Sequence, residues 1–188
     1  GDAEIWTPKN YGDKVMGKVS LRTALVKSLN LPTIGLCEEL KPKLVIAYSR
    51  RFGITAEMME DLTTCLGSLS VTLQEMISAY GVFANQGRLV KPIYILRVED
   101  QDGNILESSV SELKQVTSEE TAFLVSNVLQ DVVKRGTGRR ARAIGRPSAG
   151  KTGTTNDSID AWYIGYIPQL LTGVYVGFDK PRRMGKSE

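Results

Sequence analysis

Hydrophobic residues recur every three to four positions in several segments of the chain, which is the spacing of an amphipathic helix. The first of these segments begins at Ser20, and Leu21, Ala24 and Leu25 fall on one face of it. An Asn-Leu-Pro run that ends at Pro32 follows. Because proline forces the preceding residue out of the helical region, we expect this run to stop the first helix.

Two further helices carry end signals of their own. Pro42 opens a helix that we expect to run to Phe52, because proline is compatible with a first helical turn. Gly53 follows, and glycine readily adopts the left-handed conformation that ends a helix. Thr72 and Glu75 have the spacing of a capping box at the start of the next helix.

The longest predicted helix begins at Thr117 or Ser118, either of which can act as its N-cap. Its apolar stripe fits the helical period well and consists of Val125, Val128, Leu129, Val132 and Val133. The sequence Gly136-Thr-Gly138 ends the helix and leads into a basic loop, RRARAIGRPS.

The remaining apolar runs are short and read as strands. Residues 92–99 and 104–107 form a hairpin around an Asp-Gly turn, and three runs near 151–155, 161–167 and 170–178 follow. Connections between the last three are too short for crossovers, so we expect antiparallel pairing. Helices followed by an antiparallel sheet predict an α+β fold.

The amino-acid composition excludes several kinds of catalytic and binding site. The chain has 188 residues and no histidine, which excludes a Ser-His-Asp triad and any histidine-ligated zinc site within it. A net charge of +3 is too small to indicate a nucleic-acid partner. No stretch reaches the 18 apolar residues of a membrane span, and the first residues do not resemble a signal peptide. Catalysis must therefore use Ser, Lys, Thr, Asp, Glu or Tyr.

The two cysteines, Cys37 and Cys65, leave two alternatives open. They can form a disulfide if the protein is exported. We favour buried free thiols, which behave as small hydrophobic side chains.

Residues 145–152 match GxxxxGK[ST], the pattern of a phosphate-binding loop. Such a loop needs a buried strand before it and a helix after it, because the amides of the helix N-terminus hold the phosphates. The preceding run RRARAI is too basic for a buried strand, and the strand-like run AWYIGYI follows too soon for a helix. We therefore reject nucleotide binding.

The same stretch contains Lys151-Thr152-Gly153, one of three motifs of penicillin-binding proteins and class A β-lactamases. A lysine there places positive charge beside the acyl centre, threonine hydroxyls donate to a substrate carboxylate, and glycine lets an extended substrate lie against the strand. Ser28-Leu-Asn30 has the form of the middle motif, Ser-x-Asn. Taken alone, that motif is better explained as the end of a helix.

Longer segments around these motifs resemble the transpeptidase domain of class A (bifunctional) penicillin-binding proteins. They are WTPKNYGDKVMGKVSLRTALVKSLNLPTI, LGSLSVTLQEMISAYGVFANQGRLVKP and AGKTGTTNDSIDAWYIGYIPQLLTGVYVGFD. The resemblance implies a penicillin-binding protein/β-lactamase-like fold, an antiparallel sheet flanked by helices. Residues 1–188 would be the C-terminal part of one such domain, truncated before residue 1 and after residue 188.

The resemblance also implies roles for individual residues. Ser28 would relay a proton between the catalytic lysine and the leaving amine, and Asn30 would hold the acylamino chain of the substrate. The N–H of Thr154 would contribute to the oxyanion hole. Lys151 would complete this catalytic set.

Three consecutive residues would bind substrate according to the same resemblance: Thr152, Gly153 and Thr154. The two threonine hydroxyls, together with Lys151, would hold the terminal carboxylate. Gly136-Thr-Gly138 either borders the site or only ends the long helix, and both interpretations stay open.

One departure from the family pattern concerns the nucleophile. No Ser-x-x-Lys precedes Ser28, and the one that occurs, Ser111 to Lys114, follows the middle motif in a polar stretch. We interpret Ser111 as coincidence and expect the nucleophile to lie outside this chain, so the fragment alone should be inactive.

The resemblance implies a bacterial D,D-transpeptidase that acts on D-Ala-D-Ala stem peptides, binds β-lactams and needs no metal or cofactor. Its parent would carry a glycosyltransferase domain and a membrane anchor and act on the periplasmic face of the inner membrane. The missing remainder of its own domain would be its first partner. The alternative is a non-acylating relative that only binds wall peptide or acts as a scaffold.

Overall fold

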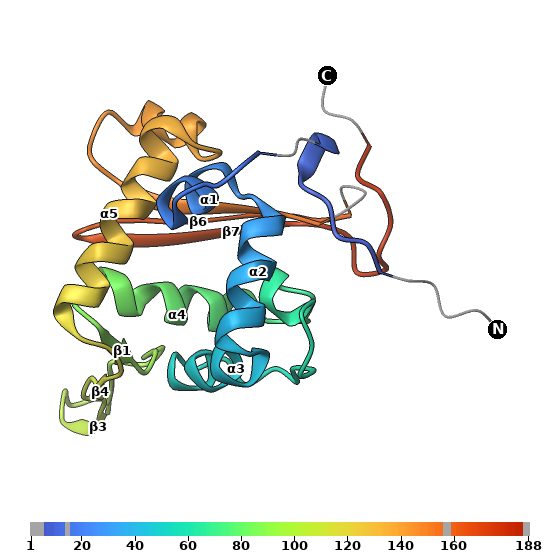
Figure 1. The fold of residues 1–188 in the computed structure, drawn as a ribbon. Coiled ribbons are helices and arrows are strands. Elements are labelled where there is room, and N and C mark those ends of the chain that lie inside the picture. Colours follow the sequence, from blue (N-terminus) through green and yellow to red (C-terminus); the bar gives the residue numbers. More distant parts are fainter. Residues whose placement is uncertain (1–5, 14–15, 156–158, 186–188) are drawn as a thin grey trace.

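The computed structural model describes residues 6–13, 16–155 and 159–185 of the chain. A three-stranded antiparallel sheet lies at its centre, and helices pack against one face and one edge of it (Figure 1). The sheet consists of β5 (Ala149–Thr154), β6 (Ala161–Ile167) and β7 (Leu170–Val176), in the order β5-β6-β7. The predicted α+β class and the hairpin connections are confirmed.

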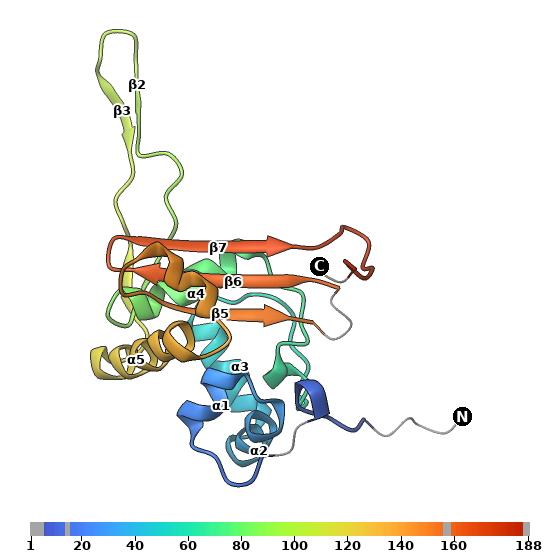
Figure 2. The same ribbon diagram turned by 90° about the horizontal axis from the view of Figure 1, so that it is seen from above.

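In the part of the chain that the structure describes, five α-helices precede this sheet. They are α1 (Leu21–Lys27), α2 (Asn30–Leu40), α3 (Pro42–Arg51), α4 (Leu73–Ala84) and α5 (Glu119–Arg135). Short 3-10 turns lie at η1 (Tyr11–Asp13), η2 (Thr64–Leu66) and η3 (Arg139–Ile144). Figure 2 shows the sheet face on, with α4 behind it and α1, α2 and α5 beyond the β5 edge.

The end signals act as the sequence predicts. Pro42 occupies the first turn of α3, and Gly53 after it has a φ of 91°. At the start of α4 both halves of the capping box are formed, since the Thr72 hydroxyl accepts from the Glu75 N–H and the Glu75 carboxylate accepts from the Thr72 N–H. Ser118 is the N-cap of α5.

Pro32 does not stop the first helix, so that prediction is wrong in its mechanism. Helix α1 ends earlier, at Ser28, and Pro32 lies in the first turn of α2, a helix that the pattern analysis did not predict. A first-turn N–H has no partner within its own helix, so proline there loses no hydrogen bond. The same rule that explains Pro42 therefore applies to Pro32.

Two small sheets lie away from the central one. The strands β2 (Arg97–Glu99) and β3 (Ile105–Ser108) form the predicted hairpin, which projects from the rest of the molecule (Figure 2). The strands β1 (Arg88–Val90) and β4 (Leu113–Gln115) form an antiparallel pair at its base that the sequence did not predict. Strands of three residues are too short to show an alternating pattern.

The core joins the helices to the sheet edge. It is formed by Val26 of α1, Leu129 and Val132 of α5, Ala149 of β5 and Tyr166 of β6, all buried. An ion pair between Arg22 and Asp131, 2.7 Å long, reinforces the α1–α5 contact at the surface. On the face of the sheet, α4 packs so closely that a Cβ at Gly173 would overlap the Ile77 side chain.

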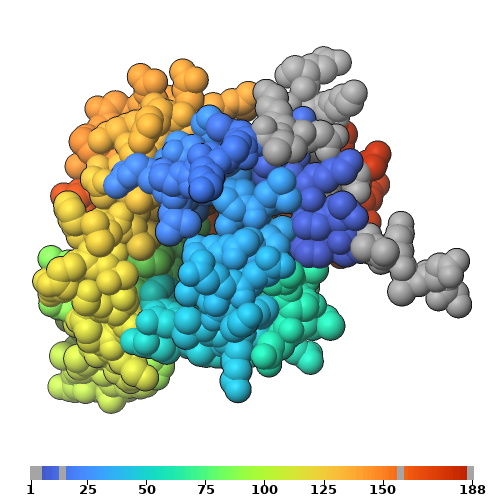
Figure 3. Space-filling view, viewed as in Figure 1, coloured from blue at the N-terminus to red at the C-terminus, as the bar shows by residue number. Residues whose placement is uncertain are grey.

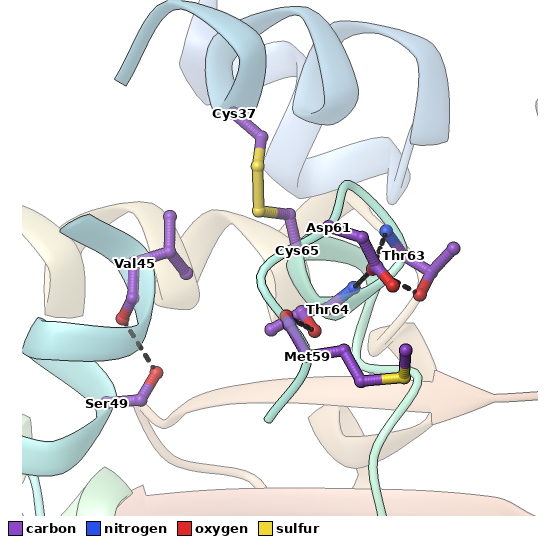
Figure 4. The surroundings of a disulfide bond; sticks show 8 residues. All are labelled: Cys37, Val45, Ser49, Met59, Asp61, Thr63, Thr64 and Cys65. Atoms are coloured by element: carbon purple, nitrogen blue, oxygen red, sulfur yellow. Dashed lines mark hydrogen bonds between the residues drawn. A yellow bond between two sulfur atoms is a disulfide. The ribbon is translucent and has the colours of Figure 1, made fainter. Parts of the chain in front are cut away.

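Cys37 and Cys65 form a disulfide, which corrects the preference for free thiols (Figure 4). Cys37 lies on α2 and Cys65 in η2, and their Cα atoms are 6.3 Å apart because the two elements pack together. The sequence alone could not show this proximity, since 28 positions separate the two residues.

Candidate active site

Ser28 lies at the C-terminal end of α1 in the left-handed conformation, with φ 53° and ψ 51°. Its backbone N–H closes the helix by donating to the carbonyl oxygens of Ala24 and Leu25. Residues other than glycine seldom adopt this conformation, and such positions cluster at functional sites. The side chain of Ser28 is exposed, and its hydroxyl is directed at β5.

Lys151 of β5 contacts Ser28 directly. Its Nζ donates to the Ser28 Oγ at 2.8 Å and to the carbonyl oxygen of Thr152, also at 2.8 Å. Burial disfavours the charged amine and lowers the pKa of Lys151 to about 8. The structure thus brings together two predicted site residues that are 123 positions apart in the chain.

Asn30 is the first residue of α2, two positions beyond Ser28. Its Nδ2 donates to the carbonyl oxygen of Lys9 at 2.8 Å, and the next N–H, that of Leu31, donates to Asn10 Oδ1. These bonds attach the N-terminal segment to the start of α2. The structure therefore places Asn30 two residues from Ser28 but engages its amide with Lys9.

The three residues after Lys151 continue along β5 with alternating orientation. The Thr152 hydroxyl donates to the Thr137 hydroxyl at 2.7 Å. Gly153 pairs with Trp162 of β6, and a Cβ there would lie 3.3 Å from the Trp162 Cβ. Thr154 ends the strand in an exposed position.

Thr137 also contacts this group of residues, and the sequence left open whether its turn borders the site or only ends the long helix. It lies in the turn that follows α5, and its backbone N–H donates to the carbonyl oxygen of Val26 on α1 at 3.3 Å. Figure 3 shows the surface of α1, in blue, against the orange surface of the segment that follows α5. The Gly-Thr-Gly sequence was the available signal, and it does not distinguish a helix terminator from a site residue.

The structure also bears on two alternatives that the sequence analysis rejected, a phosphate-binding loop and Ser111 as the nucleophile. A phosphate-binding loop would require a helix N-terminus at Gly150, Lys151 and Thr152, but these residues lie inside β5. Ser111 is exposed and lies two residues before β4, which pairs with β1 rather than with the central sheet. Within residues 6–13, 16–155 and 159–185, no helix is long and apolar enough to cross a bilayer.

Comparison with known proteins identifies the family of this chain. The family model of the penicillin binding protein transpeptidase domain matches residues 1–180. The chain therefore belongs to the penicillin-binding protein transpeptidase family, and the resemblance inferred from its motifs is confirmed. Penicillin-binding protein 1A of Aquifex aeolicus is 38% identical over 183 residues, which is 97% of this chain and 25% of that protein. Penicillin-binding protein 1A of Neisseria meningitidis is also 38% identical, over 193 residues, 98% of this chain and 24% of its own length.

Solved structures show the same fold. The crystal structure of penicillin-binding protein 1A from Haemophilus influenzae matches with a TM-score of 0.90 at 29% identity, over 97% of this chain and 33% of that one. PonA1 of Mycobacterium tuberculosis in complex with penicillin V matches with a TM-score of 0.80 at 26% identity, over 93% of this chain and 52% of that one. The chain spans about a quarter of the length of the curated relatives it matches.

Proposed function

We propose that this chain forms one wall of the active site of a peptidoglycan D,D-transpeptidase that works through a serine acyl-enzyme. The observation that carries the proposal is the 2.8 Å hydrogen bond from Lys151 to the Ser28 hydroxyl, which joins the middle and the last family motif. Membership of the transpeptidase family supports it.

The nucleophile is a serine of a Ser-x-x-Lys motif outside residues 1–188. Its oxygen attacks the carbonyl of the D-Ala-D-Ala peptide bond while the lysine of that motif accepts its proton. Ser28 passes this proton to the departing D-alanine amine, so the C–N bond breaks and an ester remains. An acceptor amine then attacks the ester, forms the cross-link and returns the enzyme serine to its free form.

Lys151 prepares Ser28 for this relay. A protonated Nζ that donates to the Ser28 Oγ leaves the hydroxyl proton free to point at the leaving group. The positive charge also favours the anionic transition state and the substrate carboxylate. Because the pKa of Lys151 is about 8, the amine is mostly charged at neutral pH.

Substrate contacts follow the direction of β5. The hydroxyls of Thr152 and Thr154 donate to the terminal carboxylate, and the Thr154 N–H donates to the oxyanion. Gly153 has no side chain, so the substrate backbone can lie against the strand between Thr152 and Thr154. Asn30 exchanges its Lys9 contact for the acylamino group of the donor peptide. A β-lactam mimics the dipeptide and stays bound as the ester.

The larger protein adds the remaining parts. A glycosyltransferase domain, a membrane anchor and the missing strands and helices of the transpeptidase domain complete it, and it acts at the periplasmic face of the bacterial inner membrane. The mechanism uses side chains and the backbone N–H of Thr154, and it requires no metal or cofactor. The low share of its relatives that this chain covers supports a larger parent.

The test is a transpeptidation assay with the natural polypeptide that contains this chain. A D-Ala-D-Ala pentapeptide and an amine acceptor should yield free D-alanine and a cross-linked product, and penicillin should block both. Ser28→Ala should lower the rate by about 10²–10⁴-fold. Binding of the pentapeptide without release of D-alanine would contradict the proposal and support a non-acylating wall-peptide module.

A further inference from the structure

The turn Gly136 to Gly138 touches both walls of the proposed site. Toward α1, the Thr137 N–H donates to the carbonyl oxygen of Val26, two residues before Ser28. A Cβ at Gly136 would clash with that same oxygen, so the close approach requires glycine. Toward β5, the hydroxyl of Thr137 accepts from Thr152.

These contacts close a circuit of hydrogen bonds. Lys151 Nζ donates both to the Ser28 hydroxyl and to the Thr152 carbonyl oxygen. The Thr152 hydroxyl donates to Thr137, and the Thr137 N–H donates to α1, the helix that ends at Ser28. Thr152 is thereby held at two points: its carbonyl by Lys151 and its hydroxyl by Thr137. The hydroxyl of Thr152 has one defined direction as a result.

Ending α5 does not need the Thr137 hydroxyl. The N–H groups of Gly136 and Gly138 both donate to the Val132 carbonyl oxygen, at 3.0 and 3.1 Å, and these backbone bonds close the helix. Thr137 itself is exposed, so packing does not need its side chain either. Among the described residues, the hydrogen bond of this hydroxyl is the one with Thr152.

We propose that Thr137 is a positioning residue that directs the Thr152 hydroxyl toward the substrate carboxylate. The inference deepens the proposed function and rests on it. A hydroxyl has one proton and two lone pairs, whereas a carboxylate only accepts. When the carboxylate binds, the Thr152 proton turns from Thr137 to the carboxylate oxygen, and Thr137 donates its own proton to Thr152 Oγ1. The hydrogen bond between the two threonines is thereby kept with its direction reversed, and two hydrogen bonds in series strengthen each other.

The test compares a carboxylate ligand with its neutral ester in the natural polypeptide. Second-order acylation rates are measured for benzylpenicillin and for its methyl ester, with wild type, Thr137→Val and Thr137→Ser. Valine keeps the shape of threonine without the hydroxyl, and serine keeps the hydroxyl. Because both ligands are measured on the same preparation, the acid-to-ester ratio does not depend on the folded fraction.

We expect Thr137→Val to lower the acid-to-ester ratio by about five- to tenfold, the usual contribution of one neutral hydrogen bond, because the bond that is lost joins the two threonines. Thr137→Ser should keep the ratio within about twofold of wild type. An unchanged ratio in Thr137→Val, with wild type acylated normally, would overturn the inference about Thr137 but not the proposed function. Equal loss of both rates would assign Thr137 a purely structural role and overturn it as well. Wild type that neither ligand acylates would contradict the proposed function and the inference together.

Discussion

The junction of α1, α5 and β5 and the β2–β3 hairpin represent opposite ways of building structure. At the junction, segments far apart in the sequence bury one another, and Val132 is 0% exposed. In the hairpin, large apolar side chains face solvent: Leu96 is 74% exposed and Leu106 is 66% exposed. The hairpin turn is fixed locally, since the Asp100 carboxylate accepts from the N–H groups of Asp102 and Asn104.

The difference separates the region that holds the buried core and the proposed site from a hairpin that projects into solvent (Figure 2). Ser28, Lys151 and Thr137 all lie at the junction, where buried neighbours fix the backbone on either side of them. The hairpin contributes few contacts to the rest of the molecule, as its projecting position shows (Figure 2). Substitutions of one residue type in the two regions should therefore have very different effects.

The largest contrast is expected between two lysines. Lys151→Met removes the amine that holds the Ser28 hydroxyl, and it should slow acylation by penicillin about 10²–10⁴-fold. Lys91→Met, at the base of the hairpin, removes only an exposed pair with Glu112 and should leave the rate unchanged. The measurement is the second-order acylation rate of the natural polypeptide. Equal acylation rates in the two variants would contradict the special role proposed for Lys151.

Two leucines test whether the junction contributes more to the free energy of unfolding than the hairpin does. Leu129→Ala at the buried junction should lower the free energy of unfolding by about 2–5 kcal/mol, because it leaves a cavity between α5 and the sheet. Leu106→Ala in the hairpin should change it by less than about 0.5 kcal/mol. Urea unfolding of the complete transpeptidase domain gives both values. A cost above about 2 kcal/mol for Leu106→Ala would show that the hairpin is covered in the complete domain.

The disulfide offers a third region for comparison, because it joins α2 to η2. Replacing both Cys37 and Cys65 by alanine should cost about 2–4 kcal/mol, since the unfolded chain regains the freedom of the closed loop. Reductant should destabilise the wild type by a similar amount and leave the double variant unaffected. A wild type that is indifferent to reductant would show that the bond does not stabilise this region.

The smallest expected effect is a pH dependence. Burial lowers the pKa of Lys151 to about 8 from its ordinary value of 10.5, so its charge is lost as pH rises through 8. Acylation should then fall about tenfold between pH 7 and pH 9. The same shift predicts that the Lys151 contribution to folding stability rises with pH between about 8 and 10.5, because the unfolded chain binds more protons there. An acylation rate that stays constant up to pH 10 would show that the charge of Lys151 is not required.

Local signals in the sequence account for much of the fold. The capping box at Thr72, the first-turn proline at Pro42 and the glycine after α3 all act within one helical turn, so the sequence alone identifies them. The pattern does not predict helix α2, because a proline such as Pro32 is compatible both with a helix terminator and with a first helical turn. The pattern does not predict the β1–β4 pair, because each strand has three residues and 23 positions separate Val90 from its register partner Leu113, where β4 begins.

The site was less accessible to sequence reasoning. The contact between Ser28 and Lys151 spans 123 positions, and no periodicity reports it; only the family resemblance paired the two motifs. The Thr137–Thr152 bond and the Cys37–Cys65 disulfide depend on how elements pack and were left open or misjudged. Contacts of this kind are set by tertiary packing, which single-sequence patterns do not encode.

The most direct test of the account is the intact mass of two polypeptides after incubation with penicillin: residues 1–188 alone, and the natural polypeptide that contains them. The account predicts one covalent adduct on the natural polypeptide, at a serine outside these residues, and none on residues 1–188. An adduct on residues 1–188 would contradict it, because Ser28 or Ser111 would then react directly. Absence of an adduct on both would contradict the acyl-enzyme itself and favour a binding module.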